Sequence, residues 1–192
     1  TTLFRSGRGP VVVLVGEAPR SSAALAEDLE WLGEHFRVIA LDLPGCGSSS
    51  PLPQAQPSVG DVAAALAEAV TALGIGRCAF YGAGIGAQVV LRLTADNPRC
   101  TALSILDSLP VTSPPDRPTS REDEIELQAD GGHLPRLWNR MLDELRYAPG
   151  EIPSAASRLA VGLPDDLGLH RRCTDLSLAG PHAAFLRAGA TG

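Results

Sequence analysis

A run of glycines lies where an apolar strand is expected to pass into a helix. The run reads Phe80-Tyr81-Gly82-Ala83-Gly84-Ile85-Gly86-Ala87. In the pattern G-x-S-x-G, a sharp strand-to-helix turn presents a nucleophile, and the N–H of the next residue donates to a developing oxyanion. Here the central position is Gly84, which has no side chain, and the donating N–H belongs to Ile85. The segment therefore predicts a nucleophile elbow without its nucleophile.

The same glycines also match a second pattern. Gly82, Gly84 and Ala87 fit G-x-G-x-x-G/A, the phosphate-binding turn of dinucleotide-binding domains, in which glycine at the second position is ordinary. Asp107 follows the next expected strand, near the place of a ribose-binding acid. This alternative leaves the glycine turn on a late strand, whereas the dinucleotide motif opens its sheet.

Two further segments follow expected strands and would meet the elbow at one edge of a parallel sheet. Gly16 and Glu17 follow the apolar run Val11–Val15, and the loop 42–49 follows Arg37–Leu41. We expect the backbone N–H of Glu17 to be the second oxyanion donor, and Gly16 and Cys46 to lie at a pocket. Cys46 is the one candidate for a substitute thiol nucleophile.

The elements that must position these residues alternate between strand and helix. The predicted strands are 11–15, 37–41, 77–81 and 101–106, and the predicted helices begin near Ser22, after Ser58 and at Ala87. Such alternation predicts a parallel sheet with helices on both faces. The pattern stops at Leu109, and the rest reads as helical or irregular, with one helix over 134–147.

The order of these motifs resembles that of the α/β-hydrolase superfamily. Its members carry a His-Gly turn, a D-x-P-G-x-G-x-S loop and the elbow, which correspond here to 15–16, 42–49 and 82–86. The resemblance implies an α/β fold with a parallel-sheet core over residues 1–109 and a helical lid over 110–192. It also implies a truncated fold, because the chain starts within the second family strand and stops before the strands that carry the triad acid and histidine.

The departures from the family pattern bear on activity. Val15 replaces the usual histidine, Gly84 replaces the nucleophile, and a carboxylate at Glu17 would oppose an oxyanion if it pointed inward. Asp107, at the end of a strand, and His133, in the lid, are the remaining candidates for catalytic residues. Trp138 is similar to a lid residue of some bacterial members and is a pocket candidate. Losing a triad member costs about 10⁴-fold or more in turnover, so a competent serine hydrolase is not expected.

Composition limits the other function classes. The 192 residues are 44% hydrophobic with a net charge of −6, which argues for a packed core and against nucleic acid as the main partner. The longest apolar run is too short to cross a membrane. The four cysteines form no CxxC pair, so no metal site is expected, and no cofactor is implied. We expect a cytoplasmic protein, with an exposed sheet edge that favours a homodimer.

Three functions are consistent with the resemblance. The first is a fold member that has lost its nucleophile and binds a small apolar molecule. The second is a non-hydrolytic enzyme (a lyase, isomerase or cyclase) that uses Glu17, Asp107 or His133 for proton transfer. The third is an active hydrolase whose serine was removed by engineering and whose chain is incomplete.

Overall fold

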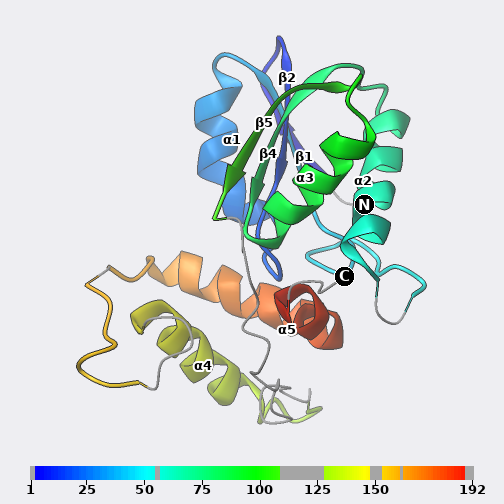
Figure 1. The fold of residues 1–192 in the computed structure, drawn as a ribbon. Coiled ribbons are helices and arrows are strands. Elements are labelled where there is room, and N and C mark those ends of the chain that lie inside the picture. Colours follow the sequence, from blue (N-terminus) through cyan, green and yellow to red (C-terminus); the bar gives the residue numbers. More distant parts are fainter. Residues whose placement is uncertain (1–2, 55–56, 109–127, 148–152, 161, 189–192) are drawn as a thin grey trace.

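The computed structural model describes residues 3–54, 57–108, 128–147, 153–160 and 162–188. A five-stranded sheet has the order β1-β3-β2-β4-β5 (Figure 1). β1 (Leu3–Ser6) is antiparallel to β3 (Arg37–Leu41). The other strands are parallel: β2 (Val11–Val15), β4 (Cys78–Ala83) and β5 (Thr101–Asp107). The mostly parallel sheet confirms the predicted fold class.

Helices cover both faces of this sheet. After β2 the chain forms the short 3-10 helix η1 (Ser22–Leu25) and α1 (Ala26–Gly33). α2 (Val59–Ala72) and α3 (Ile85–Asp96) lie on the opposite face, where they bury the larger core cluster around Phe80, Ile39 and Leu66. A smaller cluster around Leu14 and Leu29 lies under α1. Apolar repeats at helical spacing produce both interfaces.

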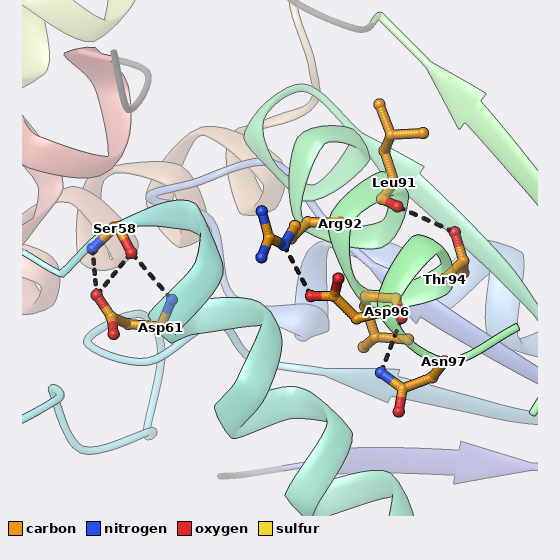
Figure 2. Close-up of polar contacts among 8 residues, drawn as sticks. Ser58, Asp61, Leu91, Arg92, Thr94, Asp96 and Asn97 are labelled. Carbon is orange, nitrogen blue, oxygen red and sulfur yellow. Dashed lines mark hydrogen bonds and ion pairs between the residues drawn. The ribbon is translucent and has the colours of Figure 1, made fainter. Parts of the chain in front are cut away.

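Local polar contacts fix the helix ends. Ser58 and Asp61 form a capping box at the start of α2: the Asp61 N–H donates to Ser58 Oγ at 3.1 Å, and the Ser58 N–H donates to the Asp61 carboxylate at 2.7 Å (Figure 2). At the end of α3, Asn97 Nδ2 donates to the carbonyl of Leu93 at 2.9 Å. These contacts satisfy backbone groups that a helix cannot pair internally.

A second helical layer lies beyond the carboxyl ends of the parallel strands (Figure 1). α4 (Leu134–Arg146) and α5 (Asp166–Ala188) pack on each other through their own apolar cluster, which includes Leu137, Met141 and Leu176. The predicted helix over 134–147 is confirmed by α4. No helix in the described ranges is long and apolar enough to cross a membrane.

After β5 the described residues add no further strand. Residues 178–182 lie inside α5, where Leu169, Leu176 and Ala179 recur at helical spacing and are buried. The described residues between 159 and 165 form no strand, and the nearest pairing is a single antiparallel bridge between Tyr147 and Arg158. The proline-rich stretch that begins after Leu109 lies outside the described residues.

Candidate functional site

The glycine run forms a sharp turn between β4 and α3. Gly84 adopts φ 56° and ψ −126°, a conformation that side-chain-bearing residues rarely adopt. Its N–H donates to the carbonyl of Asp107 at 3.1 Å, and its carbonyl accepts from the Ala87 N–H at 3.0 Å. β4 therefore ends and α3 begins within two residues, as an elbow requires.

The glycines on either side of Gly84 allow close backbone packing. A Cβ on Gly82 would lie 2.5 Å from the carbonyl oxygen of Gly86, and a Cβ on Gly86 would lie 2.5 Å from the carbonyl oxygens of Val15 and Gly16. Such separations leave no room for any side chain. The elbow thus packs directly against the carboxyl end of β2.

Glu17 covers the nucleophile position. β2 and β4 are parallel, and Val15 lies opposite Gly82. Glu17 and Gly84 each come two residues later, so they lie beside each other. A Cβ on Gly84 would lie 2.8 Å from Glu17 Cγ and 3.3 Å from its Cβ and Cδ. Glu17 is exposed, so its carboxylate reaches solvent from this position. The space that a nucleophilic side chain would fill is therefore taken by a side chain from the loop that follows β2.

The start of α3 supplies backbone donors beside this carboxylate. Ile85 is the first residue of α3, and the first N–H groups of a helix have no partner within the helix. The helix dipole adds positive potential at the same end. The elbow thus presents both a carboxylate and backbone N–H groups at the carboxyl edge of the sheet. This is where the strand order reverses between β2 and β4, and where ligands bind in open α/β sheets.

Charged residues connect the loop after β2 to the α4–α5 layer. The N–H of Ser21 donates to Asp175 Oδ2 at 3.0 Å, and Asp175 is buried on α5. Burial lowers the pKa of Arg172, as does the charge of Arg20, whereas the charge of Glu17 acts to raise it. Arg20 Nε is buried and has no hydrogen-bond partner in the part of the chain that the structure describes. α5 thus lies against the loop that carries Glu17.

Asp107 is engaged away from the elbow. Tyr81 donates to Asp107 Oδ2 at 3.0 Å, and Ser108 donates to Asp107 Oδ1 at 3.1 Å. Desolvation and then this hydrogen bond raise the pKa of Tyr81. Tyr81 packs with the cluster under α1, on the face of the sheet opposite α3. In the described residues, the hydrogen bond between Asp107 and Gly84 is made by the backbone carbonyl of Asp107.

His133 and Trp138 make contacts within the second helical layer. His133 is buried before α4, and its Nδ1 accepts from the N–H of Gln128 at 3.0 Å. The Trp138 ring meets the edge of His170 on α5, with ring centroids 5.1 Å apart. Trp138 therefore belongs to the α4–α5 interface, and His133 orders the turn before α4. No hydrogen bond among the described residues joins either side chain to Gly84 or Glu17.

Cys46 does not lie at the mouth of a pocket, as the sequence led us to expect. Its side chain is fully buried in the core beside the sheet, so a role as an accessible thiol is ruled out by its placement. The loop around it is held by Asp42, whose carboxylate accepts from the backbone N–H groups of Ser22 and Ser48. The D-x-P-G-x-G-x-S loop is therefore a structural feature here. Ser48 and Ser49 both donate hydrogen bonds to Asp42 and so stabilise the turn.

Sequence reasoning missed Arg20, Arg172 and Asp175. They come from the loop after β2 and from a helix more than 140 residues later, and no local pattern links them. Among the described residues, no group of three His, Cys, Asp or Glu side chains could hold a metal ion.

Comparisons with known proteins agree with this geometry. RutD of Escherichia coli O44:H18 (strain 042 / EAEC), described as a carbamate hydrolase, is 33% identical over 100 residues, which cover 52% of this chain and 36% of RutD. The chain thus spans about a third of the length of this curated relative. The structure of Cfl2 from Burkholderia cenocepacia superposes with a TM-score of 0.70 at 22% identity, covering 97% of this chain and 66% of Cfl2. Epoxide hydrolase VrEH1 from Vigna radiata gives 0.68 at 18% identity, covering 97% and 66%.

The family model for the alpha/beta hydrolase fold matches residues 13–146, which include most of β2, β3 to β5, the elbow and α4. Because the match includes the glycine turn, it overturns the dinucleotide-binding interpretation of Gly82, Gly84 and Ala87. The chain belongs to the alpha/beta hydrolase fold family.

Proposed function

We propose that this protein binds a small, largely apolar carbonyl compound at the elbow and forms no covalent acyl-enzyme with it. The observation that carries the proposal is the composition of the elbow: Gly84 has no nucleophilic atom, and Glu17 occupies the space above it. An acyl-enzyme needs a side chain at this point. The backbone donors at the start of α3 are suited to a carbonyl oxygen and do not depend on that side chain.

Relatives support the ligand class. RutD is described as a carbamate hydrolase, and AidH, with a TM-score of 0.62 at 20% identity, as an N-acyl homoserine lactonase. A serine-to-glycine mutant of AidH has been crystallised with N-hexanoyl homoserine lactone, so a glycine variant of this fold can hold a carbonyl compound. Carbamates and lactones share a polarised carbonyl carbon.

A titration with 2-heptanone, a carbonyl compound that has no leaving group, tests the binding. We expect saturable changes in the amide NMR signals of Gly84, Ile85 and Glu17, and none at Gly76, which is exposed and precedes β4, at the end of the strand opposite the elbow. Replacing Ile85 by Pro removes the N–H that is expected to bind the carbonyl oxygen, and proline is tolerated in the first turn of a helix. This variant should fold and lose the saturable changes. Unchanged elbow signals in the parent protein would contradict the proposal.

A further inference from the structure

We infer that Glu17 takes over the chemical role of the missing nucleophile by activating water as a general base. The inference rests on the proposed function, because it requires the ligand carbonyl to sit at the elbow. It goes further in assigning a reaction, the hydrolysis of an ester in one addition and elimination sequence with no covalent intermediate.

The placement of Glu17 carries the inference. Three carbons of its side chain lie within 3.3 Å of the point where a Gly84 Cβ would be, so the carboxylate extends from the site of the absent nucleophile. The parallel register of β2 and β4 sets this proximity through the backbone. A carboxylate there is one water molecule away from a carbonyl carbon bound at the elbow.

Glu17 is accessible to water and lies near other charged residues. The side chain is exposed, so water reaches the carboxylate without any opening of the fold. The guanidinium of Arg172 on α5 and the carboxylate of Glu17 carry opposite charges and are close enough to interact. The Ser21–Asp175 hydrogen bond holds α5 against the same loop.

Hydrolysis begins with the attack of a water molecule that is hydrogen-bonded to Glu17. The water oxygen forms a bond to the ester carbonyl carbon while Glu17 takes one water proton, and the π electrons of the carbonyl move onto its oxygen. That oxyanion accepts a hydrogen bond from the Ile85 N–H. The intermediate then collapses, the bond from carbon to the alcohol oxygen breaks, and Glu17 returns the proton to the leaving oxygen. The products are the acid and the alcohol, and Glu17 is regenerated.

Turnover of p-nitrophenyl butyrate by the purified protein tests this role. We expect hydrolysis above the buffer rate with no initial burst of p-nitrophenol. Glu17→Gln should lower kcat by about 10²-fold, a typical contribution of general-base catalysis, with KM within about twofold. Glu27→Gln, which removes a carboxylate from the first turn of α1, is the matched control and should leave both constants unchanged. Glu17→Asp should restore part of kcat.

Each outcome separates the two proposals. Equal kcat for the parent protein and Glu17→Gln, or no hydrolysis above buffer while 2-heptanone still binds, overturns the role of Glu17 and leaves the proposed function standing. A stoichiometric burst with a butyryl adduct in the intact mass overturns the proposed function itself. If circular dichroism shows that Glu17→Gln is unfolded, its loss of kcat is not informative, and Glu17→Asp decides the question. A folded Glu17→Asp variant that is as inactive as Glu17→Gln overturns the inference.

Discussion

At the scale of single residues, the elbow keeps its backbone shape while the reactive side chain is absent. Gly84 has a conformation that strains other residues, and the Glu17 side chain fills the space that a serine would need. The strained turn is the one an elbow requires, so the space taken by Glu17 is what distinguishes this position. A serine at this position would meet both the strained backbone conformation and the Glu17 side chain.

Gly84→Ser should destabilise the protein by about 1–3 kcal/mol, because the serine would adopt a strained backbone conformation and collide with Glu17. Adding Glu17→Ala should recover part of the loss, since it removes the collision and leaves the strain. Urea unfolding of the two single variants and the double variant measures this coupling. Strictly additive effects would show that Glu17 does not lie over Gly84.

Gly86→Ala should destabilise the protein by about 3 kcal/mol or more, because its Cβ would overlap the carbonyl oxygens of Val15 and Gly16. Gly76→Ala is the matched control. A Cβ on Gly76 meets nothing within 4 Å, so this change should be close to neutral. Thermal unfolding of both variants gives the comparison, and equal melting temperatures would contradict the close packing of α3 on β2.

At the scale of elements, the sequence predicted most of the core. The predicted strands Val11–Val15 and Arg37–Leu41 match β2 and β3 to the residue. The elbow was predictable because glycine spacing is a local signal. The contacts of α5 were not, because Asp175 pairs with Ser21 across 154 residues and a buried aspartate has no sequence signature.

Local patterns also misplaced individual side chains. Cys46 belongs to the loop 42–49, which we expected to lie beside the elbow. Its small thiol is instead buried in the core. The sequence also contained no sign that the ring nitrogen of His133 accepts a backbone N–H before α4. Side-chain direction depends on tertiary packing, which spacing alone does not encode.

The capping box of α2 should give a pH-dependent contribution to stability. Hydrogen bonds from Ser58 lower the pKa of Asp61 below its usual 3.8, so the carboxylate stabilises the fold above that value. The stability difference between the parent protein and Asp61→Asn should therefore be largest near neutral pH and vanish as the pH falls through the lowered pKa. Urea unfolding between pH 7 and pH 3 measures it. A difference that grows on acidification would contradict the capping contact.

At the scale of the whole molecule, β5 presents exposed apolar side chains on one face of the sheet. Leu103 and Ile105 are 55% and 51% exposed, and the register places them beside Ala79 and Tyr81 on the face that carries α1. β5 pairs with β4, and in the described residues its other edge has no strand partner. An exposed apolar face at a free edge favours association between chains.

This face should make the protein self-associate. We expect light scattering after gel filtration to show a mass above 20.0 kDa that rises with concentration. Ile105→Lys should shift the population toward the monomer, because a charge on this face would be costly to bury. Arg92→Glu, on the exposed side of α3, is the control. A monomer at all concentrations would contradict the homodimer expectation.

The central claim is that the elbow at Gly84 carries no covalent catalysis. The most direct measurement is the intact mass of the protein after incubation with excess fluorophosphonate, a reagent that modifies the activated serine of hydrolases. The account predicts an unchanged mass, because Gly84 has no nucleophilic atom and the Glu17 carboxylate acts only through water. A single added phosphonyl group that maps to any residue at the elbow would contradict it.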